Sequence, residues 1–293
     1  MNVGIGVCQG TFGELAQGVR GHLPFLFTLP IDWKSKSEFY PSEQPAVRCT
    51  DSSKRKAILA CRKTLEFVGI KGGGTLHIQS NLPVGKGMAS SSADIVASMR
   101  AVANAYNIEL AADIISELAA DIEATDGVMY PGIVSYNHIH GELIECYDFP
   151  GSMRLLGFDT GGVVDTKTFT DGKETYSSIE LTQFEKVYEQ LSRGLKEKKH
   201  VDIFEAATLS ARLNQRLLPK PYFDLFEEIA DENGWGIVVA HSGTVMGLLM
   251  DGHEKNVDWK IKKAVACIQH ITGWSPWLFS LGAALLENQN QAF

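Results

Sequence analysis

The sequence lacks any apolar run near the length of about 20 residues that a membrane helix needs. Its first ten residues also lack the basic stretch followed by apolar residues that marks a signal peptide. We therefore expect a cytoplasmic protein. Basic residues are in deficit, since 27 Lys and Arg face 35 Asp and Glu, which gives a net charge of −8. An acidic chain repels a phosphate backbone, so nucleic acid is not an expected partner.

Cysteine pairs at metal-binding spacing are missing as well. The five cysteines are odd in number, and none belongs to a CxxC pair or to the Cys/His pattern of a zinc site. We expect free thiols. His138 and His140 alternate along one predicted strand, and His241 lies in a glycine-containing loop, but no third ligand at zinc spacing accompanies them. No structural metal is expected.

What the chain has is the composition of a folded globular protein. Its 293 residues, 44% hydrophobic and 21% charged, suit one large domain or two modest ones that share a cleft. No internal repeat, low-complexity tract or long linker interrupts it. We expect two lobes, residues 1–150 and 151–293.

Strand and helix patterns alternate in both predicted lobes, which indicates the α+β class. In residues 1–150 we expect strands within 24–40, a helix at 54–68, a strand at 74–80, helices at 90–106 and 111–125, and a hairpin within 135–149. In residues 151–293 we expect a strand at 153–160, helices near 181–198, 201–217 and 221–232, paired strands at 235–243 and 244–251, a helix at 257–271 and a strand at 277–282. The second set is compatible with a ferredoxin-like lobe.

A glycine-rich segment joins the predicted strand at 74–80 to the predicted helix at 90–106. It contains the candidate ATP-binding residues Pro83, Gly85, Lys86, Gly87, Met88, Ala89, Ser90, Ser91 and Ser92. Glycines let backbone N–H groups approach a phosphate, and a helix N-terminus adds free N–H donors and the positive end of its dipole. The serine hydroxyls can cap the helix, bind a phosphate oxygen or ligate Mg²⁺.

This segment is not a Walker A loop, because Lys86 precedes the serines and the GxxxxGK[ST] spacing is absent. The local pattern alone leaves two interpretations open. One is a phosphate-binding loop, and the other is a glycine-rich turn with an ordinary serine cap.

Three motifs in order along the chain resemble those of one family. The segment PVGKGMASSSAD at 83–94 resembles the phosphate loop PxxxGLGSSAA of the GHMP kinases, the superfamily of galactokinase, homoserine kinase, mevalonate kinase and phosphomevalonate kinase, with Ala89 at a usual glycine. CQGTFGELAQG at 8–18 resembles the N-terminal PGxxxELxG element, with Gln9 for proline. WGIVVAHSGTVMGLL at 235–249 is similar to the C-terminal glycine-rich loop, although a plain hairpin explains it as well.

The residues of the three motifs are most similar to those of the L-threonine kinases of adenosylcobalamin synthesis and propanediol utilisation. The resemblance implies a GHMP-kinase-like two-lobe fold, with an N-terminal, ribosomal-S5-like lobe that binds ATP and a C-terminal ferredoxin-like lobe. It also implies ATP and Mg²⁺ as cofactors and a small hydroxyl compound as substrate. A homodimer is a possible assembly.

Two acids are the candidates for the chemistry, because phosphoryl transfer needs Mg²⁺ near the phosphates and often a base for the acceptor's proton. Glu123 and Asp126 lie three residues apart at the end of the predicted helix at 111–125, on one helical face. We assign Glu123 and Ser91 to Mg²⁺, and Asp126 to the base or to acceptor positioning. The family usually separates these acids further, so Asp126 binding the substrate's amino group, or a solvated acidic helix end, is the alternative.

The candidate acceptor-site residues are Glu14, Asp159, Thr160, Asp165 and Gly243. The resemblance places Glu14 in the acceptor pocket, and Asp159 or Asp165 would face an ammonium group. A strand followed by a turn is the alternative for residues 158–169. Mevalonate-type kinases have a lysine where this chain has Thr11, so a lysine-assisted mechanism is not carried over, although Lys86 could compensate.

The sequence therefore predicts an ATP- and Mg²⁺-dependent kinase that converts L-threonine to O-phospho-L-threonine for cobalamin side-chain synthesis. The alternatives are a kinase for homoserine or another small hydroxyl compound, and a non-catalytic ligand sensor on the same scaffold. Loss of the loop serines or of the acidic pair would indicate the sensor. Ser90, Ser91, Glu123 and Asp126 are all present.

Overall fold

The computed structural model describes residues 2–162 and 176–282, so the candidate Asp165 lies outside the described residues. The strands are β1 (Gly4–Arg20), β2 (Leu23–Ser42), β3 (Val47–Cys49), β4 (Gly73–Ser80), β5 (Ile133–Asn137), β6 (Glu142–Tyr147), β7 (Met153–Asp159), β8 (Gly236–Val239), β9 (Val245–Asp251) and β10 (Pro276–Leu281). The helices are α1 (Arg55–Phe67), α2 (Ser90–Ala105), α3 (Ala112–Ala120), α4 (Ser178–Glu197), α5 (His200–Asn214), α6 (Phe223–Asn233) and α7 (Val257–Thr272). None of these helices is long and apolar enough to cross a membrane.

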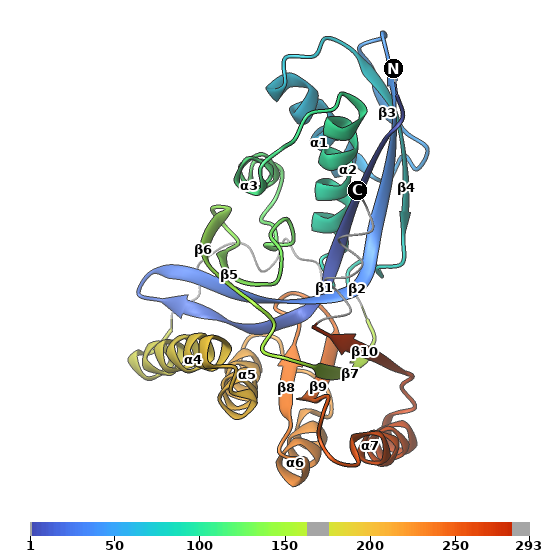
Figure 1. Ribbon diagram of the computed structural model, residues 1–293. Coiled ribbons are helices and arrows are strands. Elements are labelled where there is room, and N and C mark those ends of the chain that lie inside the picture. The colour runs from blue at the N-terminus through green and yellow to red at the C-terminus, as the bar shows by residue number, and fades with distance from the viewer. Residues whose placement is uncertain (1, 163–175, 283–293) are drawn as a thin grey trace.

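One curled sheet runs through the described chain in the order β10-β7-β9-β8-β1-β2-β4-β3, with β5 beside β2 and β6 beside β5. The long strands β1 and β2 pair antiparallel from Gly4↔Phe39 to Arg20↔Leu23. Their register shifts three times between Gln9 and Ala16, and such irregularities bend a strand. Figure 1 shows the pair running beside α2 and then turning across the top of α4 and α5. The motif at 8–18 forms this bend, at a place where the sequence predicts no strand.

Helix α2 packs closely on β1 because small residues face each other. A Cβ on Gly6 would overlap the carbonyl oxygen of Ala97, so only glycine lets the strand come this near to the helix. Nearly every residue of α2 is buried, which explains its many Ala and Ser side chains. The close contact fixes the N-terminus of α2 relative to the bend in β1.

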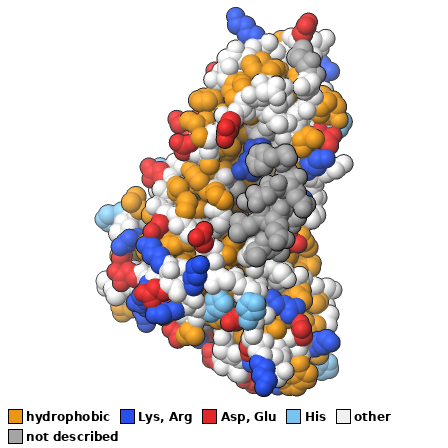
Figure 2. Space-filling view, in the orientation of Figure 1, with side chains coloured by type: hydrophobic (Ala, Val, Ile, Leu, Met, Phe, Trp, Pro, Cys, Tyr) orange, Lys and Arg blue, Asp and Glu red, His pale blue; other side chains and the backbone are white. Residues whose placement is uncertain are grey.

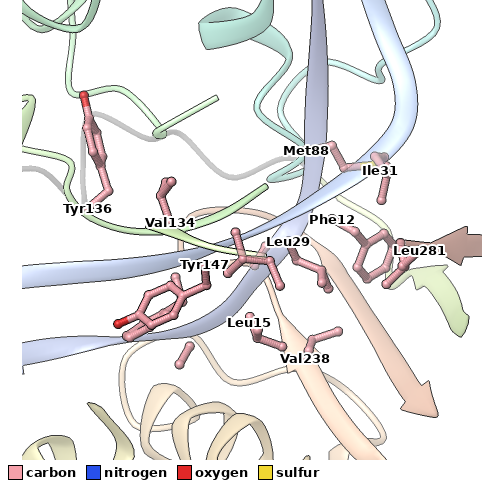
Figure 3. Packing of buried hydrophobic residues seen from close by; sticks show 14 of the residues in the cluster. Phe12, Leu15, Leu29, Ile31, Met88, Val134, Tyr136, Tyr147, Val238 and Leu281 are labelled. Atoms are coloured by element: carbon pink, nitrogen blue, oxygen red, sulfur yellow. The ribbon is translucent and has the colours of Figure 1, made fainter. Parts of the chain in front are cut away.

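The hydrophobic core continues across residue 150. Figure 3 shows Phe12, Leu15 and Leu29 of the bent strand pair near Val238 of β8 and Leu281 of β10, and all five belong to one buried cluster. Helices α6 and α7 lie at the far end of the molecule, and charged side chains of both signs mix over the region of α4 and α5 (Figures 1 and 2). The division into residues 1–150 and 151–293 stays a prediction.

The predicted elements are confirmed within a few residues of their ends, and the α+β class is confirmed with them. The exception is the helix expected at 111–125, since α3 ends at Ala120. Beyond its end the Ile122 and Glu123 N–H groups both donate to the Ala119 carbonyl, and the Thr125 N–H donates to the carbonyl of His138, 3.1 Å away, instead of to a helical carbonyl. Glu123 and Asp126 therefore lie on a loop, and their predicted position on one helical face is wrong.

Candidate active site

The glycine-rich segment ends in an uncapped helix N-terminus. Ala89 precedes α2 with φ 55, in the left-handed region that costs a residue with a side chain about 1 kcal/mol or more. Glycine avoids this cost, which accounts for its usual place in the resembling motif. No side chain of the described residues caps α2, so the predicted serine cap is wrong. The first N–H groups of the helix therefore stay available to an anion.

The three serines at the start of α2 point in different directions. Ser90 is buried, and its hydroxyl donates to the Leu82 carbonyl over 3.3 Å. Ser91 is exposed, and its hydroxyl donates to Glu123 Oε1 over 2.5 Å. Ser92 Oγ lies 3.3 Å from Asp126 Oδ2. Both predicted acids thus reach the same helix start, even though they lie on a loop.

Glu123 and Ser91 together fit Mg²⁺. A carboxylate and a hydroxyl oxygen lie side by side next to free N–H groups, and hard divalent cations prefer such oxygen ligands. The second carboxylate oxygen of Glu123 pairs with the ammonium of Lys56, so this site already attracts a cation. Among the described residues no group of three or more His, Cys, Asp or Glu side chains could hold an ion, so phosphate oxygens would have to complete the coordination.

Asp126 is a partly buried carboxylate whose pKa is shifted toward neutrality. Burial is the largest cause, and the negative charge of Glu123 adds to it, while the hydrogen bond with Ser92 acts in the opposite direction. The net effect raises the pKa of Asp126 to about 6. A carboxylate with such a pKa suits general-base catalysis near neutral pH.

Lys86 of the loop is held in place by the end of β7. Its ammonium lies 2.8 Å from Asp159 Oδ2 and donates to the Gly162 carbonyl over 2.7 Å. Asp159 Oδ1 accepts a 2.6 Å hydrogen bond from the Thr244 hydroxyl. Burial acts to raise the pKa of Asp159, but the hydrogen bonds from Lys86 and Thr244 outweigh it and the pKa is lowered. Asp159 is therefore an ionised partner of Lys86.

Thr160 makes a second link between β7 and the turn before β9. Its N–H and its hydroxyl both donate to the Thr244 carbonyl, at 3.0 and 2.8 Å. The hydroxyl is therefore already used within the protein. The assignment of Asp159 and Thr160 to the acceptor stays a prediction.

The first and third motifs both contact the glycine-rich loop at 83–89. A Cβ on Gly243 would overlap Gly87 N and Lys86 O, and the Thr244 N–H donates to Lys86 O over 3.0 Å. From the other side, the Gly13 N–H donates to Gly87 O over 2.9 Å. Gly87 itself has φ +81, a conformation that favours glycine. The structure thus brings the three motifs to one place.

Glu14 lies at the buried end of this site. It is 7% exposed, and its Oε2 accepts a hydrogen bond from the His241 N–H. Burial, followed by the negative charge of Asp126, raises its pKa well above the usual value.

Sequence reasoning missed Lys220, which joins this buried end. Its side chain is 6% exposed, and its ammonium donates to the Gly243 carbonyl over 2.7 Å. Burial lowers the pKa of Lys220 to about 8, although the charge of Glu14 acts to raise it. The available signal was a single charge among apolar and proline residues in LLPKPYF at 217–223.

Two histidines complete the buried end. His241 Nδ1 lies 2.5 Å from Gln17 Oε1, and its ring centre lies 5.1 Å from that of His138. Burial lowers the pKa of His138 to about 3 and that of His241 to about 4. Both imidazoles are therefore neutral near pH 7. The five cysteines are free thiols, as expected.

Comparisons with known proteins agree with these motifs. Residues 54–133 match the GHMP kinases N terminal domain. The L-threonine kinase of Citrobacter freundii is 28% identical over 259 residues, which cover 86% of this chain and 88% of that protein. The L-threonine kinase of Salmonella typhimurium is 28% identical over 255 residues, which cover 85% of this chain and 84% of that protein.

The fold is shared with solved GHMP kinases. The homoserine kinase of Cytophaga hutchinsonii superposes with a TM-score of 0.77 at 15% identity, covering 96% of this chain and 94% of that one. The phosphomevalonate kinase of Streptococcus pneumoniae, solved with phosphomevalonate and AMPPNP, gives a TM-score of 0.74 at 13% identity over 96% of this chain and 100% of that one. The two-lobe fold class is therefore confirmed.

Proposed function

We propose that the chain is a GHMP kinase that transfers the γ-phosphate of ATP to the hydroxyl group of L-threonine, giving O-phospho-L-threonine. The observation that carries this proposal is the pairing of two carboxylates with the open N-terminus of α2. Glu123 is held by Ser91 and Asp126 by Ser92. One helix start thus offers phosphate-binding N–H groups, a metal-binding carboxylate and a base.

ATP phosphates would lie against the loop at 83–89 and the first N–H groups of α2. Anions bind such helix ends because the N–H groups point outward and the dipole is positive there. Only Ser91 offers an exposed hydroxyl, since Met88, Ala89, Ser90 and Ser92 are buried and would contribute backbone groups alone. Mg²⁺, when bound to Ser91 and Glu123, offsets negative charge on the phosphates.

Asp126 would accept the proton of the threonine hydroxyl. Its pKa of about 6 leaves it mostly ionised at pH 7, yet close enough to neutrality to hold a proton during transfer. Lys86 would approach the transferred phosphoryl group from the side of β7, where Asp159 fixes its ammonium. Catalysis then comes mainly from positioning and from electrostatic stabilisation.

Glu14 would bind the ammonium group of the acceptor. Its carboxylate is buried and has only the His241 N–H as a hydrogen-bond partner among the described residues. A cation beside it would restore the ionised form, because opposite charge lowers the pKa of a carboxyl group. The choice of threonine over homoserine follows the two similar L-threonine kinases, and the product would then serve cobalamin side-chain synthesis.

A substrate screen tests the proposal. Purified protein with Mg²⁺ and ATP is assayed for ADP release with L-threonine, D-threonine, L-serine, L-homoserine and small alcohols. We expect kcat/KM for L-threonine to exceed the others by about tenfold or more, equivalent to about 1.4 kcal/mol of transition-state binding. A better rate with homoserine would move the substrate assignment within the family. No acceptor-dependent ADP release at all would favour the non-catalytic sensor.

A further inference from the structure

The buried end of the site holds charged groups that the protein itself leaves incompletely satisfied. We call Glu14, Lys220, His138 and His241 the buried cluster. Glu14 and Lys220 are 7% and 6% exposed, so both are largely removed from water. Buried charges are normally paired and fully hydrogen-bonded, because desolvation costs several kcal/mol per ion. The cluster departs from this rule in three ways.

First, the ammonium of Lys220 uses one of its three N–H donors. It donates to the Gly243 carbonyl over 2.7 Å, and residues 2–162 and 176–282 offer it no second hydrogen bond. One hydrogen bond from a charged donor offsets only part of the cost of burying the charge. Two donors are left for a ligand.

Second, Glu14 and Lys220 interact electrostatically without a direct contact. Each acts on the pKa of the other, yet no ion pair within 4.0 Å joins them in the part of the chain that the structure describes. Glu14 Oε1 likewise has no hydrogen-bond partner there. The Glu14 carboxyl group and the Lys220 ammonium thus bind two ends of one turn, at the His241 N–H and the Gly243 carbonyl, and each keeps unused hydrogen-bonding capacity.

Third, His138 Nδ1 is buried without a hydrogen-bond partner. Its ring stands edge to face with that of His241, whose backbone N–H binds Glu14. An unpaired polar atom therefore lies next to the His241 side chain. The three unsatisfied groups come from different elements, namely β1, the turn after β5 and the segment between α5 and α6, and each contacts the turn at His241–Gly243.

We propose that Lys220 is a specificity-determining residue, which binds the carboxylate of an α-amino acid acceptor while Glu14 binds its ammonium group. This inference rests on the proposed function. A zwitterion supplies both missing partners at once, whereas an alcohol, a sugar or a simple amine supplies at most one. Lys220 also holds the Gly243 turn against the phosphate loop, so a purely structural role is the alternative that the test must separate.

The test compares two acceptors that differ only in the carboxylate. (R)-1-Amino-2-propanol has the hydroxyl and amine of L-threonine but a hydrogen in place of the carboxylate. We measure kcat/KM for both acceptors, and KM for ATP, with wild type and with Lys220→Met. Lys260→Met is the control, since Lys260 is a partly exposed lysine of α7 that pairs with Glu254.

For Lys220→Met we expect kcat/KM for L-threonine to fall by about 10²-fold, as a lost buried charge contact does, while the value for the amine changes less than about threefold. KM for ATP should stay within about twofold. The control should change neither acceptor. Calorimetry with AMPPNP present should show the same loss in L-threonine affinity.

Equal losses for both acceptors would mean that Lys220 only supports the fold of the site, and a raised KM for ATP alone would make it a phosphate-binding residue. Either result overturns the inference and leaves the proposed function intact. A wild type that phosphorylates no amino acid overturns both. Should Lys220→Met not fold, Lys220→Arg serves instead. It should keep the preference for L-threonine over the amine, and equal values for the two acceptors contradict the inference.

Discussion

The charged side chains around the glycine-rich loop at 83–89, which we call the phosphate end of the site, and those of the buried cluster have different kinds of partner. Around the loop, two charged side chains that we assign to the chemistry have partners of opposite sign, since Lys86 pairs with Asp159 and Glu123 pairs with Lys56. In the buried cluster, Glu14 accepts from an N–H group and Lys220 donates to a carbonyl, so both partners are neutral. The difference indicates which kind of ligand each end can bind.

The ion pairs at the phosphate end are partly open to solvent, so a nucleotide and its metal can compete for Lys86 and Glu123. Buried and incompletely satisfied charges gain much more from a ligand of complementary charge. The first arrangement therefore suits a co-substrate that brings four negative charges and a metal. The second suits a small acceptor that must be selected.

Asp126 lies between the two ends and should give the largest effect. Asp126→Asn keeps the shape but cannot accept a proton, so kcat should fall by about 10²-fold or more, a typical general-base contribution, with ATP affinity nearly unchanged. Steady-state kinetics with varied ATP and L-threonine measure both. The pH profile should change as well. In wild type kcat/KM should drop below about pH 6, where Asp126 becomes protonated, and the variant should lose this limb.

The control for this variant is Asp121→Asn, since Asp121 is an exposed neighbour that pairs with Lys63. It should leave kcat within about twofold, as surface substitutions usually do. If Asp126→Asn also keeps most of its kcat, Asp126 is not the base. The enzyme would then work by positioning alone.

The second prediction concerns the contact that joins the two ends. Gly243→Val would drive a side chain into Gly87 N and Lys86 O and displace the phosphate loop. We expect the dissociation constant of Mg·ATP to rise by about 10–10²-fold, since loop N–H groups must align with the phosphates to within a fraction of an ångström. Calorimetry with AMPPNP measures it. Gly234→Val is the control, because its side chain would meet open space and strain only the end of α6. Similar ATP affinity in both variants would contradict the role of the contact.

Local patterns were enough to predict the order of strand, glycine-rich loop and helix around α2, whereas the phosphate-binding role of the loop was favoured only by the family resemblance. These features depend on neighbours in sequence, such as the strand before the glycines and the helix after them. The serine cap was wrong because Ala89 adopts the left-handed conformation and itself takes the cap position. The prediction that Glu123 and Asp126 share a helical face was wrong because the helix ends before them. The Thr125 N–H donates to the His138 carbonyl, a contact that the helix pattern at 111–125 could not show.

The buried cluster could not be predicted from local sequence patterns, for a different reason. Glu14 meets His241 across 227 residues of sequence, and Lys220 meets Gly243 across a helix and a strand. No spacing rule covers such contacts, because the curled sheet and the bend in β1 create them. Glu14 was predicted only through the family motif, and Lys220 belongs to no motif.

Glu123→Gln should produce a smaller effect that is confined to the phosphate end. An amide is a weaker ligand than a carboxylate for Mg²⁺, so the Mg²⁺ concentration for half-maximal rate should rise by about tenfold, and the rate at saturating Mg²⁺ should recover in part. Titration with Mg²⁺ at fixed ATP measures this. Glu117→Gln, an exposed change on α3, should leave the titration unchanged. A fall in kcat without any change in Mg²⁺ dependence would assign Glu123 to another role.

The smallest effect concerns stability and pH. Because the pKa of Asp126 is raised from 3.8 to about 6 in the folded protein, folding favours its neutral form. This contribution is fully present below the unfolded pKa and is lost as pH rises through about 6. Asp126→Asn should therefore be more stable than wild type at pH 8 by about 1–3 kcal/mol, with a smaller difference at pH 5. Urea denaturation at both pH values measures this, and a difference that does not grow with pH would contradict the shifted pKa.

Identification of the phosphorylated product tests the central claim most directly. Purified protein is incubated with Mg²⁺, ATP and L-threonine, and the products are followed by ³¹P NMR with authentic O-phospho-L-threonine as the standard. The account predicts that the phosphothreonine signal grows in step with ADP and is nearly absent with Asp126→Asn. ADP accompanied by inorganic phosphate alone, or a phosphoester formed from another acceptor in preference to threonine, would contradict it.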